Sequence, residues 1–189
     1  MNRIDQLIEN YRSHIQMPLR PGLAAAQRVW FAVYPAVEER RLVNRIDEFE
    51  MITNAAGHLW VRIDLKGKLA EWIGSVDEDE RADWFKHPDD IDLYAKTEWR
   101  DVLTDFICQK IIHAPDQEHT VFALTGLMEL YDFFHVSDLI EGILKNLPGH
   151  LLVFFPGEID NNVYRFLDAR EGWNYLATPI TCQDSFIKL

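Results

Sequence analysis

A chain of 189 residues with 48% hydrophobic and 12% aromatic residues is long enough for one folded domain with its own core, and this composition excludes a disordered protein. Its formal net charge of −12 argues against direct nucleic-acid binding, because phosphate binding depends on clustered lysine and arginine side chains. No apolar run reaches the roughly 18 residues of a membrane span, and the N-terminus lacks an apolar signal segment, so we expect one cytoplasmic domain over residues 1–189 and no membrane partner.

The N-terminal third of the chain predicts two helices and two strands. Apolar residues recur at steps of three and four from Asn2 to Ile15, which indicates an amphipathic helix. The continuous apolar run Val29–Tyr34 predicts a buried strand. One apolar stripe predicts a single helix over Val37–Thr53, and alternating apolar residues in His58–Leu65 predict a strand nearer an edge of the sheet.

The rest of the chain continues the alternation of helices and strands. Helices are predicted at Lys68–Ile73, at Ile91–Ile112 and after His135 with Ser137 or Asp138 as N-cap, and a helical turn at Val163–Leu167. Strands are predicted at Thr120–Gly126, Leu151–Gly157 and Tyr175–Thr178. This order predicts the α/β class, with a mostly parallel sheet of about five strands covered by helices on both faces.

The charge of the chain is unevenly distributed. Eight acidic residues lie between Asp77 and Asp92, against Arg81 and Lys86 alone. A solvated loop or helix start explains such a stretch, and docking to a basic partner is the more specific alternative.

Cysteine and histidine provide no recognisable chemical motif. Cys108 and Cys182 are too far apart in sequence for metal-ligand spacing, and we expect no disulfide in a cytoplasmic protein. The seven histidines show neither metal-ligand spacing nor an adjacent Ser or Cys motif, so packing or surface roles are expected for them. We expect no cofactor.

Ligands of open α/β sheets collect beyond the carboxyl ends of the strands, here after Tyr34, Leu65, Gly126 and Gly157. None of these segments has a phosphate-binding loop. The first strand runs into Pro35, which has no amide to donate, and Pro156-Gly157 stands where a magnesium-binding Asp-Glu pair would follow a buried strand.

Several carboxylates remain as candidates for an acidic site. Asp64 ends a strand, and Asp168 lies in a charged segment where an ion pair with Arg170 is the alternative. Glu158 and Asp160, with Asn161 and Asn162, offer oxygen ligands for a hard cation. In the alternative interpretation Pro156-Gly157 turns the chain and one of the asparagines caps a helix.

The segment Leu127–His135 is unusually apolar for the end of a strand. Its candidate partner-binding residues are Leu127, Met128, Tyr131, Phe133 and Phe134. Methionine and aromatic side chains are typical of adaptable interfaces, and a lid folded back on its own core explains the same composition.

Five segments together resemble the BrxB family, a component of the bacteriophage exclusion (BREX) defence systems. They are 28–35, 39–50, 57–61, 123–139 and 152–176, and the likeness spans nearly the whole chain. The most specific motif is Leu152-Val153-Phe154-Phe155-Pro156-Gly157-Glu158 with its continuation to Leu176. The resemblance implies a cytoplasmic phage-defence protein that works beside a DNA methyltransferase, a large ATPase and the alkaline-phosphatase-like protein PglZ, its expected direct partner.

Two hypotheses of function follow. The first is a non-enzymatic adaptor that holds a BREX complex together, based on the missing motifs, the apolar segment and the acidic stretch. The alternative is a metal-dependent phosphoesterase or a degenerate nucleotide-binding protein that uses Asp64, Glu158, Asp160 or Asp168. The oligomeric state, including a homo-oligomer, stays open.

Overall fold

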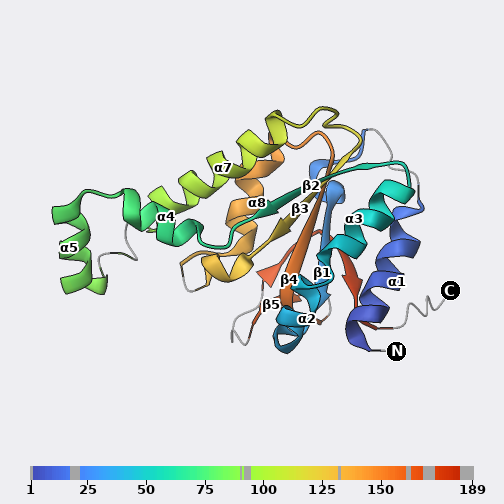
Figure 1. Cartoon of the computed structure of the whole chain (residues 1–189), viewed down its shortest axis with the longest axis horizontal. Coiled ribbons are helices and arrows are strands. Elements are labelled where there is room, and N and C mark those ends of the chain that lie inside the picture. The colour runs from blue at the N-terminus through green and yellow to red at the C-terminus, as the bar shows by residue number, and fades with distance from the viewer. Residues whose placement is uncertain are drawn as a thin grey trace.

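The computed structural model contains a single α/β domain, as the alternation of elements predicted (Figure 1). It describes residues 2–17, 22–89, 91, 95–131, 133–160, 163–167 and 173–183. The parallel strands lie in the order β2 (Leu59–Asp64), β3 (Thr120–Thr125), β4 (His150–Asp160), β1 (Val29–Tyr34) and β7 (Thr178–Thr181). Beyond the parallel part, β4 pairs antiparallel with β5 (Val163–Phe166), which pairs with β6 (Trp173–Asn174).

Helices cover both faces of this sheet. One face carries α1 (Arg3–Ile15), α2 (Glu39–Val43) and α3 (Ile46–Ala55). The other carries α4 (Lys68–Ser75), α5 (Glu78–Lys86), α7 (Arg100–Ile112) and α8 (Val136–Leu144). Single turns in the described residues are η1 (Ala25–Arg28), η2 (Ala36–Glu38), the π-turn η3 (Ala95–Trp99) and η4 (Leu127–Leu130).

The strands β1 and β3 are buried along their full length because each lies between two other strands. Successive side chains of a strand point to opposite faces, so Phe31 packs in the core under α7 and α8, while Trp30 packs in the core under α1 and α3. The strand β2 lies at the edge of the sheet, as its alternating pattern predicted, and exposes 41% of Leu59.

Hydrogen bonds stabilise the start of α1 and connect this helix to α3. The Asn2 side chain accepts the Asp5 N–H while the Asp5 carboxylate accepts the Asn2 N–H, which satisfies two amides of the first turn. The Tyr11 hydroxyl lies 2.5 Å from the Thr53 hydroxyl, which itself donates to the Phe49 carbonyl. This buried chain of hydrogen bonds ties α1 to α3.

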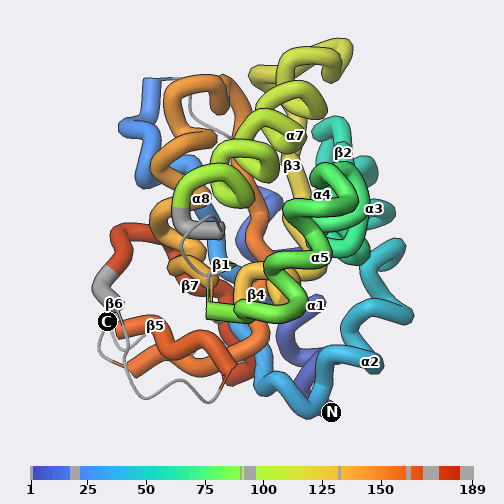
Figure 2. The backbone as a smooth tube through the Cα atoms, turned by 90° about the vertical axis from the view of Figure 1, so that its left-hand side faces the viewer, coloured from blue at the N-terminus to red at the C-terminus, as the bar shows by residue number. Residues whose placement is uncertain are grey.

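The second face is closed by two helices that run side by side, α7 and α8 (Figure 2). A Cβ on Gly142 would lie 2.9 Å from the Thr104 methyl carbon, so the glycine permits this close contact. Next to them α4 and α5 extend away from the sheet (Figure 1), joined to α7 by the ring contacts of Trp72 with Trp84 and Trp99.

The acidic stretch forms the start of a helix. Asp77 caps α5 by accepting the Asp79 N–H at 3.0 Å, and the next three acidic residues, 78–80, lie in the first turn, where the helix dipole favours them. Asp90 and Asp92, at the end of the stretch, lie outside the described residues. Cys108 is buried on α7, and both cysteines are free thiols.

Several predicted elements were wrong in detail. The single helix predicted over Val37–Thr53 is interrupted, because the backbone leaves the helical conformation at Arg45. The N-cap of α8 is His135 rather than Ser137 or Asp138. The predicted helix Ile91–Ile112 is helical at every described residue, at Ile91 and from Ala95 to Ile112, but Ala95–Trp99 forms a π-turn before α7.

The C-terminal predictions needed the largest corrections. The segment 163–167, predicted as a helical turn, forms the strand β5, in which Tyr164 and Phe166 are buried and Arg165 is exposed. Of the predicted strand 175–178, only Thr178 is in a strand, the first residue of β7, and residues 175–177 connect β6 to β7. Among the described residues no helix follows Asp160 for an asparagine to cap, and Asn161 and Asn162 themselves lie outside those residues.

Candidate functional site

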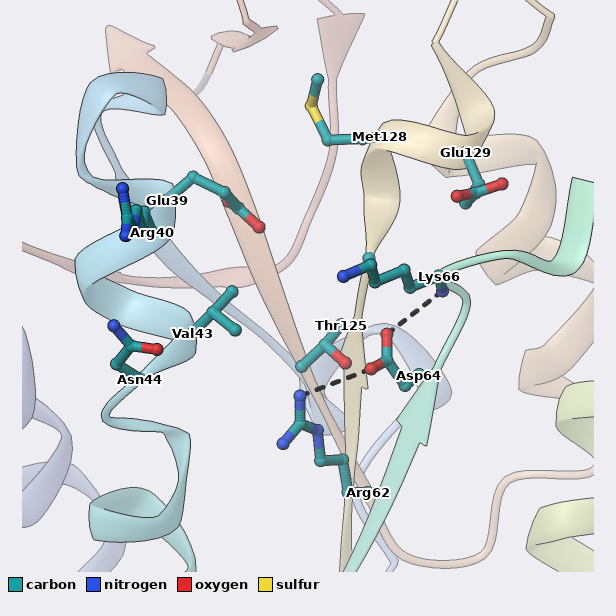
Figure 3. A pocket seen from close by; sticks show the side chains of 11 residues that line it. Glu39, Arg40, Val43, Asn44, Arg62, Asp64, Lys66, Thr125, Met128 and Glu129 are labelled. Atoms are coloured by element: carbon teal, nitrogen blue, oxygen red, sulfur yellow. Dashed lines mark hydrogen bonds and ion pairs between the residues drawn. The ribbon is translucent and has the colours of Figure 1, made fainter.

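A pocket of about 400 Å³ lies beyond the carboxyl ends of β2 and β3 (Figure 3). Its opposite wall is α2, which follows β1 in the chain. The chain after β1 passes to the face covered by α3, whereas the chain after β2 and β3 passes to the face covered by α7 and α8. Connections that leave in opposite directions open a crevice at this edge, which is where open α/β sheets bind ligands.

The sequence predicted ligand binding beyond four strand ends, and three of these segments line the pocket. They are the segments after Tyr34, Leu65 and Gly126. The fourth does not, because β4 continues past Gly157 and forms a hairpin with β5.

The floor of the pocket is held together by a close contact between the ends of β2 and β3. Gly126 has a positive φ of 80°, and a Cβ at this position would lie 2.7 Å from the Lys66 nitrogen and 2.8 Å from Asp64 Oδ1. The Leu65 N–H also donates to the Thr125 carbonyl at 3.0 Å. Only glycine fits this position without moving one of the two strand ends.

The carboxylates of the pocket accept hydrogen bonds from the protein itself. Asp64 accepts the Lys66 N–H at 3.1 Å. Glu129 accepts the Gly67 and Leu69 N–H groups at 3.0 and 3.2 Å, which caps the start of α4.

The third carboxylate, Glu39, accepts the Tyr34 hydroxyl. Burial of that hydroxyl, followed by the neighbouring Glu39 charge, raises the pKa of Tyr34. Tyr34 therefore stays protonated and remains a donor to Glu39.

The positively charged side chains of the pocket have fewer partners among the described residues than its carboxylates have. Arg62 Nη2 lies 3.4 Å from Asp64 Oδ2, and since the two side chains are 35% and 41% exposed, the pair contributes at most about 1 kcal/mol. Arg40 and Lys66 are exposed, and within the described ranges neither side chain has an ion-pair partner. Figure 3 shows the Lys66 side chain extending toward the α2 side of the pocket.

One polar group in the wall has no partner. Thr125 is 4% exposed, and its hydroxyl makes no hydrogen bond with any part of the chain that the structure describes. A buried hydroxyl without a partner costs about 1 to 3 kcal/mol, so such groups are rare in folded proteins.

The structure separates the acidic candidates. Asp64 lines the pocket, whereas Glu158 and Asp160 lie on the extended part of β4, paired in register with Arg165 and Val163. Asp168 and Arg170 lie outside the described residues. Across the described ranges no group of three or more His, Cys, Asp or Glu side chains is arranged to hold a metal ion.

The five candidate partner-binding residues fall into a buried group and an exposed group. Leu127 is buried in the core, and Phe133 and Phe134 pack partly buried against it, as a segment folded back on its own domain would. Met128 and Tyr131 are 49% and 48% exposed, and Met128 also lines the pocket. The exposed part of the candidate surface therefore adjoins the pocket.

Sequence reasoning did not find the pocket residues Arg40, Val43, Lys66 and Thr125. They come from three segments that are distant in sequence, and none belongs to a motif with fixed spacing.

A second group that the sequence did not indicate consists of His14, His150 and Trp30, near the amino ends of the strands β1 and β4. The His150 ring lies 4.7 Å from the Trp30 ring, and His14 lies 4.6 Å from Trp30 on centroid distances. Burial, followed by the charges of Arg28, His58 and His14, lowers the pKa of His150 to about 4. His150 is therefore neutral near pH 7 and belongs to the core.

In the part of the chain that the structure describes, no helix combines the length and the apolar character needed to cross a bilayer. Comparison with protein-family models, with curated proteins and with solved structures gave no match.

Proposed function

We propose that this protein is a non-enzymatic adaptor of a BREX-type defence complex in the cytoplasm and that it binds the alkaline-phosphatase-like protein PglZ directly. The proposal combines the resemblance of the segments 28–35 and 152–176 to the BrxB family with one structural observation. That observation is the exposure of three side chains near the carboxyl edge of the sheet: Val43 and Met128, which line the pocket, and Tyr131, three residues after Met128. Together they are the candidate docking surface.

This surface supports docking because of its composition and position. Val43 and Met128 are 42% and 49% exposed on opposite walls of one pocket, and Tyr131 is 48% exposed just after η4. Methionine and tyrosine are favoured at interfaces, since methionine adapts its shape and tyrosine adds an apolar ring with a polar tip. Leu127 and Leu130 are both buried at 1% exposure, so the backbone that presents the two side chains is anchored in the core.

The experiment is co-purification from cells that express the whole defence operon, with a tag on this chain. Met128→Lys and Tyr131→Ala are expected to reduce recovery of the PglZ protein by about tenfold or more, as loss of a central interface side chain does. Met51→Lys is the matched control, because Met51 is a 62% exposed methionine on α3.

Three outcomes would reject the proposal. One is that the wild-type chain recovers no other component at moderate salt. Another is that Met51→Lys weakens recovery as much as Met128→Lys does. The third is that Phe85→Ala, on the acidic helix α5, abolishes recovery while the two carboxyl-edge variants leave it unchanged.

A further inference from the structure

The carboxyl-edge pocket is lined by three cations, Arg40, Arg62 and Lys66, and three carboxylates, Glu39, Asp64 and Glu129, so its formal charge is zero. Asp64 and Glu129 accept backbone amides, and Glu39 accepts the Tyr34 hydroxyl, while Arg40 and Lys66 have no ion-pair partner among the described residues. We infer that this pocket binds a small organic oxyanion, a phosphate- or carboxylate-bearing molecule of about mononucleotide size. The inference goes beyond adaptor function and does not depend on it.

The charge in the pocket is unusual for this chain. A protein with a formal net charge of −12 repels anions over most of its surface. The pocket is a local exception, because its formal charge is zero, and Arg40 and Lys66 have no acidic partner among the described residues. The third cation, Arg62, has a carboxylate contact that is 3.4 Å long. An oxyanion would gain charge-assisted hydrogen bonds there, which are stronger than those between neutral groups.

Size and shape indicate more than a free ion. A pocket of about 400 Å³ is within the range of small-molecule sites, and it is far larger than a phosphate or sulfate ion needs. Val43 and Met128 provide apolar surface on its two walls (Figure 3). The ligand therefore has an apolar or ring part to cover these side chains in addition to its anionic group.

The acidic side chains of the pocket set a second requirement for the ligand, which must carry hydrogen-bond donors. Glu39 and Asp64 each present a carboxylate to the pocket (Figure 3), so a ligand made of anionic groups alone would meet repulsion. Hydroxyl or amino donors on the ligand would satisfy these oxygens. A nucleoside monophosphate and a hydroxylated carboxylic acid share this combination of an oxyanion with donors.

The binding mode differs from that of a phosphate loop. Pro35 has no amide to donate, and the N–H groups of Gly67 and Leu69 at the start of α4 are already bound by Glu129. Side-chain cations would thus hold the anion without a loop of backbone amides.

Isothermal titration calorimetry on the full chain at low ionic strength tests the inference, with AMP, 4-hydroxybenzoate and inorganic phosphate as probes. We expect AMP or 4-hydroxybenzoate to bind with a Kd below about 1 mM, and inorganic phosphate to bind more weakly because it covers no apolar surface. AMP binding without 4-hydroxybenzoate binding would assign the oxyanion to a phosphate ester, and the reverse result would assign it to a carboxylate.

Charge-removing variants locate the site. Arg40→Gln and Lys66→Gln are each expected to weaken binding by about tenfold, the cost of one charge-assisted hydrogen bond. Arg41→Gln is the matched control, since Arg41 is the next residue of α2 and pairs with Glu38 at 2.7 Å outside the pocket. All three side chains are exposed, so thermal melting should show unchanged folding.

The inference is overturned if neither AMP nor 4-hydroxybenzoate binds with a Kd below about 1 mM, or if Arg41→Gln weakens binding as much as Arg40→Gln. Inorganic phosphate that binds as tightly as AMP and is insensitive to all three variants would indicate an adventitious ion only. None of these results depends on PglZ, so the adaptor proposal is tested separately.

Discussion

Gly126 and Asp64 are in such close contact that a Cβ on the glycine would lie 2.8 Å from the Asp64 Oδ1 atom. This contact joins the ends of β2 and β3 and shapes the floor of the pocket. It couples the stability of the domain to the geometry of its candidate site, because any side chain at residue 126 must displace the Asp64 carboxylate or the Lys66 amide.

Substitution of Gly126 by alanine is expected to destabilise the protein by about 2 to 4 kcal/mol, from the left-handed backbone and the steric clash together. Gly57→Ala separates the two causes. Gly57 has φ of 86° with nothing within 4 Å of its added Cβ, so it carries the backbone cost alone, about 1 kcal/mol. Urea unfolding of both variants gives the comparison. Equal losses of stability would show that the contact with Asp64 is not tight.

The hydroxyls of Thr125 and Thr53 are expected to respond in opposite ways to replacement by valine. Thr125→Val removes a buried hydroxyl that has no partner among the described residues, so stability should stay the same or rise by about 1 kcal/mol. Thr53→Val removes a hydroxyl bonded to Tyr11 and Phe49 and should cost about 1 to 2 kcal/mol. Chemical denaturation measures both changes, and a loss at Thr125 equal to that at Thr53 would reveal a missed partner of Thr125.

His150 is expected to make the domain sensitive to acid. Its pKa is lowered from 6.5 to about 4 in the folded state, so the unfolded chain binds the proton more readily. The stability associated with neutral His150 is complete above pH 6.5 and is lost as the pH falls toward 4, by roughly 3 kcal/mol at most.

The measurement is the free energy of unfolding at several pH values between 7.5 and 4, for the wild type and for His150→Gln. The variant should lose part of this pH dependence, because glutamine does not titrate. His14 and His58, whose pKa values burial also lowers, and Glu48, whose pKa Arg45 lowers, still contribute to the pH dependence that remains. A variant with the same pH dependence as the wild type would contradict the assignment to His150.

The central strands were predictable from sequence because burial on both faces requires an uninterrupted apolar run. Val29–Tyr34 and Thr120–Thr125 are both of this kind. The end of β4 was not predictable in this way, since Pro156-Gly157 is a usual turn signal. In the structure Pro156 pairs with Tyr34 at the end of the parallel register, and Gly157 permits a close approach of the Arg165 carbonyl.

The pocket shows how much of the candidate site could be predicted from the sequence. Sequence indicated the correct edge of the sheet and included Asp64 and Met128 among its candidates. It did not pair them with Arg40 or Lys66, because that proximity arises from the order of the strands in the sheet, which places α2 opposite the ends of β2 and β3, and no local pattern encodes it.

Substitution of Asp64 by asparagine distinguishes an adaptor from an enzyme at this pocket. Asparagine keeps the shape of the side chain and can still accept the Lys66 N–H, so folding should change by less than about 1 kcal/mol. An adaptor needs no carboxylate chemistry here, and we expect the variant to retain both co-purification with the PglZ protein and protection against phage.

The measurement is plaque formation in cells that carry the whole operon, with recovery of the complex determined from the same cultures. Glu158→Gln is the matched control, since Glu158 is an exposed carboxylate on β4 that does not line the pocket. Loss of protection in the Asp64 variant alone, with recovery of the complex unchanged, would contradict the adaptor proposal, because a carboxylate needed for defence but not for assembly acts on a substrate.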